Sequence, residues 1–141
     1  MKVEAVMFAN EAAIDNGLLV IQGGGWEHID TPGYFPMGIT GYVAGILTLG
    51  EDQHGSLLPV LLQVFDDSGQ VEGFRASIIA NGTRPKTVQG VPYRTPFAIS
   101  FMTVASGPTV MKARLSDEGT ELAVISVAIR GGAPDTPPAD M

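Results

Sequence analysis

The side chains best suited to chemistry gather in one segment bounded by glycine and proline, residues 23–36. This segment contains the only tryptophan of the chain, one of its two histidines, two carboxylates and two further aromatic residues. A second pair of acids stands in the turn Asp66-Asp67-Ser68-Gly69. The candidate binding residues that these two loops supply are Trp26, Glu27, His28, Asp30, Tyr34, Asp66 and Asp67.

Carboxylates in two loops could serve either hydrolysis or cation binding. Glu27 or Asp30 opposite the Asp66–Asp67 turn would form the pair of acids that glycoside cleavage uses. Clustered loop carboxylates can also bind calcium, but Asp-Asp-Ser-Gly is an ordinary turn sequence and no Asp-x-Asp loop is present. His28 and His54 lack partner ligands at short spacing, which argues against zinc. We expect neither a metal nor a cofactor.

The remaining catalytic motifs are missing from the chain. It has no cysteine, so a thiolate nucleophile, a thiolate metal site and a disulfide are all excluded. The serines lack a Gly-x-Ser-x-Gly elbow. Glycines 23–25 lack the spacing of a dinucleotide-binding loop, and instead predict a bulge or a close strand crossing. We expect a non-enzymatic binding or protein-interaction module, with a small carboxylate-dependent hydrolase that uses the Trp26 end as the alternative.

The aromatic loop around Trp26 has two interpretations. Its large side chains could plug one end of a hydrophobic core, where they would contribute to stability. They could equally form an exposed surface that binds a ligand or another protein, since tryptophan and tyrosine give large contact area for little entropy loss. Both interpretations remain open at the level of the sequence.

Composition limits the classes to which the protein can belong. The 141 residues fit one domain, predicted over residues 1–130, and a Gly- and Pro-rich tail over 131–141 should be disordered. The net charge of −7 and the scattered basic residues argue against nucleic acid. No apolar run approaches the roughly 20 residues of a membrane-spanning helix. The N-terminal apolar stretch is too short for a signal peptide, so we expect a cytoplasmic protein.

Short apolar segments alternate with turn-forming residues along the chain, which is typical of sandwiches and barrels. The 18 glycines and 10 prolines disfavour helix, and at most a short helical turn is expected near 10–15. We predict an all-β fold, a two-sheet antiparallel β-sandwich of about eight strands. The predicted strands are 2–9, 17–25, 38–50, 56–66, 70–80, 95–105, 108–116 and 120–130.

These elements position the candidate residues through the direction of the strands. Turns at Asp66–Gly69 and Asp117–Gly119 predict antiparallel neighbours. If the direction alternates throughout, every second loop emerges at the same end of the sandwich. One end would then collect residues 26–37, 66–69 and 105–107, and with them all of the candidate residues.

The segment Leu57–Phe65 is apolar at nearly every position, so both of its faces avoid water. Such a strand is either central and covered on both faces, or its outer face meets a partner. Pro59 requires an edge or strand-start position because it cannot donate to the ladder. With so few charges in the chain, we expect self-association into a homo-oligomer or docking to another protein.

The opening strand, the segment Asn16–Trp26 and the stretch Gly119-Thr120-Glu121-Leu122 resemble a family of small bacterial β-sandwich proteins of unknown function. The resemblance rests on turns and strand patterns over most of the chain up to about residue 130. It implies the sandwich fold and carries no activity and no catalytic residues.

Overall fold

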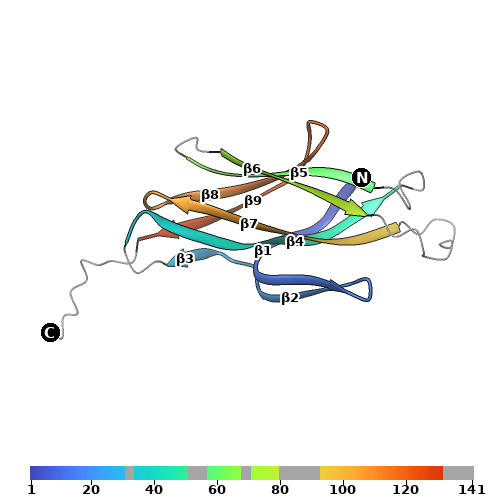
Figure 1. Cartoon of the computed structure of the whole chain (residues 1–141), viewed down its shortest axis with the longest axis horizontal. Coiled ribbons are helices and arrows are strands. Elements are labelled where there is room, and N and C mark those ends of the chain that lie inside the picture. The colour runs from blue at the N-terminus through green and yellow to red at the C-terminus, as the bar shows by residue number, and fades with distance from the viewer. Residues whose placement is uncertain (31–33, 51–56, 68–70, 80–92, 132–141) are drawn as a thin grey trace.

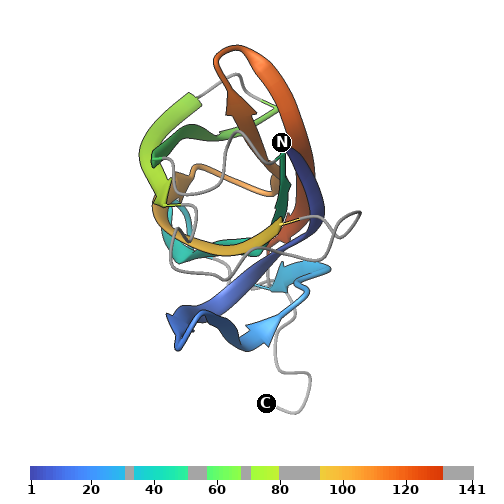
Figure 2. The ribbon, with the colours of Figure 1, turned by 90° about the vertical axis from the view of Figure 1, so that its right-hand side faces the viewer.

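The computed structural model describes residues 1–30, 34–50, 57–67, 71–79 and 93–131 (Figure 1). All regular structure in these residues is β-strand, so they contain no helix that could cross a membrane. The strands form two layers that enclose one core (Figure 2). The predicted two-sheet β-sandwich is therefore confirmed. Of the predicted tail over 131–141, residues 132–141 lie outside the described residues.

Sheet A has four strands in the order β2-β1-β4-β7, and each neighbouring pair is antiparallel. Sheet B has five strands in the order β3-β9-β8-β5-β6, antiparallel except that β3 runs parallel to β9. The strands of sheet A are β1 (Lys2–Asp15), β2 (Leu18–Gly24), β4 (Met37–Leu49) and β7 (Tyr93–Ala105). Those of sheet B are β3 (His28–Asp30), β5 (Leu57–Asp66), β6 (Val71–Ile79), β8 (Thr109–Asp117) and β9 (Thr120–Arg130).

Seven of the eight predicted strands match the structure to within two residues at each end. The first does not, because β1 continues to Asp15 through the segment where a helical turn was expected. That expectation is wrong for a local reason. Asn16 (φ 52°) and Gly17 (φ 75°) both adopt the left-handed conformation, which makes a type I′ turn and returns the chain antiparallel as β2. The strand β3 is an addition that the pattern did not predict.

Strand alternation builds the core from inward-facing residues of both sheets. In β4 the inward side chains Ile39, Val43 and Leu47 are buried, and in β8 Met111 and Leu115 are buried opposite them. The outward residues of β8 are only half-buried. Each sheet therefore has one face that is shielded from water, and these two faces pack against each other to form the core.

The apolar strand β5 lies inside sheet B, between β6 and β8. Its inner residues, such as Leu62 and Val64, are fully buried, whereas Leu61 and Phe65 on the outer face are half-buried. The guanidinium of Arg114 lies over the Phe65 ring, 4.8 Å from its centroid, and covers part of that face. Pro59 lies in the part of β5 that pairs with β6 alone, because the pairing with β8 begins at Leu61, so one side of the strand is an open edge at the proline.

Candidate functional site

The three glycines that end β2 turn the chain sharply back over the sandwich. Gly23 (φ 61°) and Gly25 (φ 81°) adopt left-handed conformations that other residues avoid. A Cβ on Gly23 would overlap the side chain of Asn10. The N–H of Gly25 donates to the carbonyl of Phe8 at 2.8 Å, which pins the turn to β1. The glycines therefore form a tight backbone turn that lies close against β1.

This turn places the indole of Trp26 against the core. The ring stacks on Phe8 at 5.5 Å between centroids and meets Phe101 edge-on at 6.3 Å. Its Nε1 donates to the Asn10 side-chain oxygen at 3.0 Å and to the Gly23 carbonyl at 2.9 Å. A Cβ on Gly41 would overlap the indole, so only glycine fits beneath it. The geometry favours the core-plug interpretation of Trp26.

Strand β3 brings His28 and Asp30 to the edge of sheet B. Asp30 accepts two hydrogen bonds from the guanidinium of Arg130, at 2.9 and 3.3 Å, which tie β3 to β9. The Nε2 of His28 lies 3.3 Å from the same carboxylate. All three side chains are substantially exposed, so this cluster contributes little to stability. The Asp30 carboxylate is therefore already paired with a cation, the guanidinium of Arg130.

Asp66 and Asp67 end β5 and are not brought to Asp30. Strands β9 and β8 lie between β3 and β5. Three strand spacings of about 4.8 Å put their backbones roughly 14 Å apart. The two carboxyl groups of a glycosidase stand closer than about 10 Å. Two strands separate these acids and Arg130 engages the Asp30 carboxylate, so the described residues give no support to the acid pair that the loops suggested.

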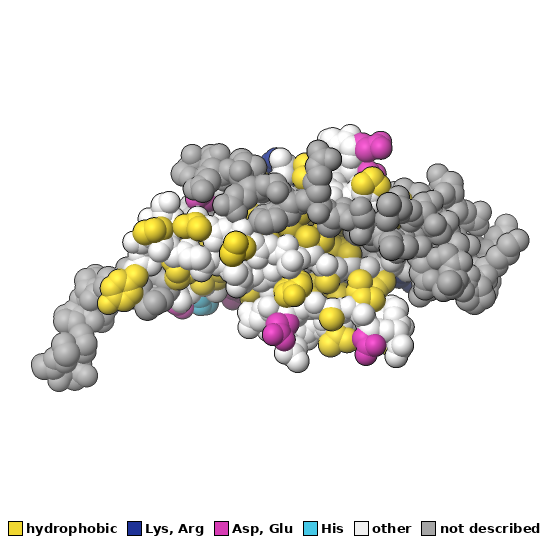
Figure 3. All heavy atoms as spheres, in the orientation of Figure 1, with side chains coloured by type: hydrophobic (Ala, Val, Ile, Leu, Met, Phe, Trp, Pro, Cys, Tyr) yellow, Lys and Arg dark blue, Asp and Glu magenta, His cyan; other side chains and the backbone are white. Residues whose placement is uncertain are grey.

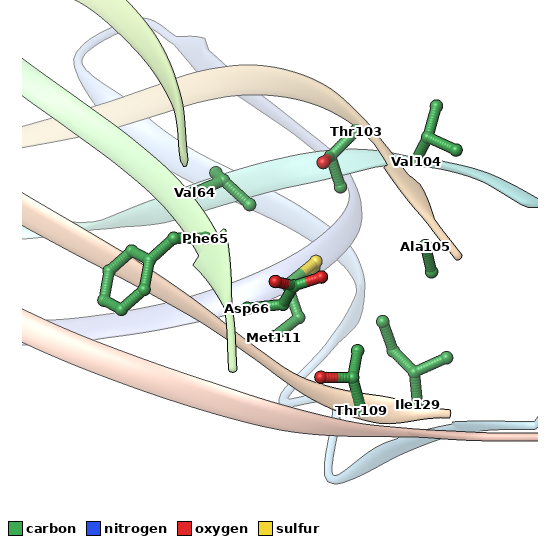
Figure 4. A pocket seen from close by; sticks show the side chains of 9 residues that line it. All are labelled: Val64, Phe65, Asp66, Thr103, Val104, Ala105, Thr109, Met111 and Ile129. Carbon is green, nitrogen blue, oxygen red and sulfur yellow. The ribbon is translucent and has the colours of Figure 1, made fainter. Parts of the chain in front are cut away.

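The end of β5 instead lies beside the β7–β8 turn, as the alternation of strand direction predicted. Asp66, Ala105, Thr109 and Met111 line a shared cavity of about 10 Å³ there (Figure 4). Such a volume holds about one water molecule. Apart from Asp66 the lining residues carry no ionisable group. The cavity is too small for a substrate.

The other candidates lie apart from one another. Tyr34 is 77% exposed, ahead of β4. The side chain of Glu27 is exposed, and its backbone carbonyl accepts from the N–H of Ala128 at 3.5 Å. Trp26 and His28 do share an open cleft of about 420 Å³, with Met37–Thr40 as its far wall. Within the described residues no three His, Asp or Glu side chains gather as a metal site requires, and His54 lies outside those residues.

A surface that the sequence analysis missed is the hairpin of residues 10–24, which we call the arm. β1 pairs with β4 from Lys2 to Ala9, and beyond Ala9 it pairs with β2 alone. The arm thus leaves sheet A and projects from the sandwich (Figures 1 and 2). Trp26 fills the space that opens where β1 departs from β4.

The arm is apolar and poorly covered. Leu18 is 69% exposed, Ile14 49% and Val20 48%. Figure 3 shows apolar side chains beside acidic ones on the projection at the lower right. The register places apolar residues on both faces of the hairpin. One face carries Ala12, Ile14, Leu19 and Ile21, and the other carries Ala13, Leu18 and Val20 together with Glu11 and Asp15.

A second open cleft, of about 420 Å³, lies between the arm and the body of sheet A. Val20, Gln22 and Glu11 form its arm side, and Tyr42 of β4 forms its body side. The arm is therefore flanked by space and does not pack flat on the sandwich. The signal for the arm was present in the sequence, since Asn16-Gly17 stands between two strand-like segments and Asn-Gly is a strong short-range hairpin motif.

The comparisons with known proteins found no match among protein-family models, curated proteins or solved structures. The resemblance to a family of small β-sandwich proteins accordingly stays a prediction.

Proposed function

We propose that this chain is a non-enzymatic protein-interaction module that associates with a second copy of itself through the arm. The observation that carries the proposal is a two-stranded apolar hairpin that stands outside the sandwich, with Leu18 at 69% exposure. Cytoplasmic residence is part of the same proposal and rests on the amino-acid sequence alone.

An isolated two-stranded hairpin is at best marginally stable in water, because it has no second layer to bury its side chains. Here both faces of the arm carry large aliphatic residues. Covering such residues gains roughly 25 cal/mol per Å² of apolar surface removed from water. A partner that packs on the arm would supply the missing layer, which supports docking as its role.

The carboxylate-dependent hydrolase has less support. The Asp30 carboxylate is engaged by Arg130, and strands β8 and β9 separate it from Asp66 and Asp67. The cleft beside Trp26 offers His28 as its one ionisable side chain. No arrangement of the described residues favours hydrolysis over binding.

Sedimentation velocity at micromolar concentrations tests the proposal. The wild-type protein should sediment as a species heavier than the 14.8 kDa chain, with a concentration dependence that shows reversible association. Replacing Leu18 and Val20 together by lysine should leave a monomer. Lysine lowers the net negative charge of each copy, so a rise in the overall repulsion between copies cannot explain the dissociation.

A matched control replaces Met102 and Val104 by lysine. These residues have the same spacing on an edge strand, and they are 64% and 42% exposed. The control should associate like the wild type. A wild-type protein that is monomeric throughout, or association that is lost in the control and kept in the arm variant, would overturn the proposal.

A further inference from the structure

The four edge strands of the two sheets differ in composition. The edges are β2 and β7 in sheet A, and β3 and β6 in sheet B. β7 contains Arg94 and Pro96, β3 contains His28 and Asp30, and β6 contains a glutamate and an arginine. The strand β2, with the sequence LLVIQGG, contains neither a charged residue nor a proline.

An open strand edge presents unpaired N–H and C=O groups to any other extended chain. Natural proteins protect such edges with charges, prolines, bulges or very short strands. The sequences of the other three edge strands contain charges or a proline of this kind, and β3 is in addition only three residues long. β2 has no such protection, so it is the edge best suited to accept a strand from outside.

We infer that β2 pairs antiparallel with β2 of a second copy, across a two-fold axis at Val20, so that the two copies of sheet A become one continuous sheet. This inference rests on the proposed self-association and names how it happens. The extended, uncharged part of β2 runs from Leu18 to Gln22, because Gly23 has a left-handed conformation. Its midpoint is Val20, which places Leu18 opposite Gln22 of the second copy.

Charge does not oppose a second copy as the partner at this edge. Each chain carries a net charge of −7, so two copies repel wherever acids face each other. The acids of the arm, Glu11 and Asp15, lie on β1. In the joined sheet the two β1 strands are three spacings apart, roughly 14 Å. That exceeds the Debye length of about 8 Å at physiological salt, so these acids barely oppose the pairing.

The faces of the arm also match under this symmetry. An axis perpendicular to the sheet joins each face of β2 to the same face of its mate, so Val20 meets Val20 and Leu19 meets Ile21. Apolar residues then adjoin apolar residues at the centre of both faces, and only at the ends does Leu18 meet the polar Gln22. Pairing of two such short edges buries less than the roughly 1,200 Å² typical of a stable interface. The association should therefore be reversible.

The absence of cysteine makes disulfide trapping a direct test, because any thiol is one that has been introduced. Val20→Cys places two thiols opposite each other across the axis, where the spacing of paired strands permits a disulfide. Ile14→Cys is the matched control. It lies on the same arm at 49% exposure, against 48% for Val20, but on β1, away from the axis.

Paired strands hold the two thiols at an effective concentration in the millimolar range, so we expect Val20→Cys to cross-link at least about tenfold faster than Ile14→Cys at micromolar protein. A second measurement fixes the register. Leu18→Cys mixed with Gln22→Cys should give a cross-linked heterodimer faster than either variant cross-links with itself.

The outcomes separate the inference from the proposed function. Equal cross-linking of Val20→Cys and Ile14→Cys, in a protein that still self-associates through the arm, would overturn the β2 pairing and leave the interaction module standing. A fast Val20→Cys reaction without the Leu18–Gln22 heterodimer would overturn the register centred on Val20. A wild-type protein that is monomeric in sedimentation would overturn both.

Discussion

The hairpins β1–β2 and β8–β9 have the same kind of turn but differ in how far their side chains are buried. Each has two left-handed residues at its turn, Asn16 and Gly17 in the first, Glu118 (φ 47°) and Gly119 (φ 85°) in the second. In β8–β9 one face packs into the core, where Leu115 is 1% exposed. In the arm Leu18 is 69% exposed. Turn chemistry therefore specifies a hairpin, whereas burial depends on whether another layer lies over it.

The largest expected effect is on the free energy of unfolding, when a leucine is replaced by alanine in each of the two hairpins. Leu115→Ala removes a buried side chain and leaves a cavity, so it should lower the free energy of unfolding by about 2–5 kcal/mol. Leu18→Ala should change the stability of the monomer by less than about 0.5 kcal/mol, because it removes exposed surface. Urea denaturation at protein concentrations low enough to keep the chain monomeric measures both. A loss of several kcal/mol for Leu18→Ala would show that the arm packs on its own sandwich.

The second comparison concerns the joint between the arm and the core, where Trp26 stacks on Phe8. Trp26→Ala should cost about 3 kcal/mol in the free energy of unfolding, near the lower end for aromatic truncations because the indole is only half-buried. The fluorescence of Trp26, the only tryptophan, should be blue-shifted in the free protein and shift red on unfolding. A stable Trp26→Ala protein with impaired association would instead make this loop a recognition surface.

How much of the structure can be predicted from the sequence depends on whether a feature is determined by residues near in the chain or by residues far apart in it. Period-two alternation and turn residues are local, and they located the sandwich strands. The arm was predicted in part, because its return strand was expected while residues 10–15 were assigned a helical turn despite Asn16-Gly17 beside them. The three-residue β3 has no local signal, since it forms by parallel pairing with β9, 100 residues away in the chain, and the Asp30–Arg130 pair only adds to that contact. The separation of Asp30 from Asp66 likewise follows from strand order, which no local pattern contains.

A smaller effect is expected from alanine at the two turn glycines. Gly119→Ala forces a Cβ into the left-handed conformation (φ 85°), and should destabilise the whole domain by about 1 kcal/mol, because the hairpin it closes belongs to the core. Gly17→Ala carries the same strain in the arm, where opening is local. Hydrogen exchange should then quicken in β2 and the end of β1, with β8 and β9 unchanged. Faster exchange throughout the domain in Gly17→Ala would mean that the arm unfolds together with the core.

The smallest effect distinguishes the two halves of β1 by their response to pH. In the half that belongs to sheet A, Glu4 accepts a hydrogen bond from Arg94 at 2.7 Å, and this bond lowers the pKa of the Glu4 carboxyl below its ordinary value of 4.5. A pKa that is lower in the folded state means that the ionised carboxylate favours folding. The contribution is full above the unfolded pKa and is lost as the pH falls through the lower, folded pKa. The stability difference between wild type and Glu4→Gln should therefore be constant near neutral pH and shrink below about pH 4.5.

Glu11→Gln, in the arm half of the same strand, is the control, because Glu11 takes part in no ion pair among the described residues. Denaturation curves recorded from pH 3 to 7 would contradict this account if both variants showed the same pH dependence relative to wild type, since the pair with Arg94 would then contribute nothing to the fold.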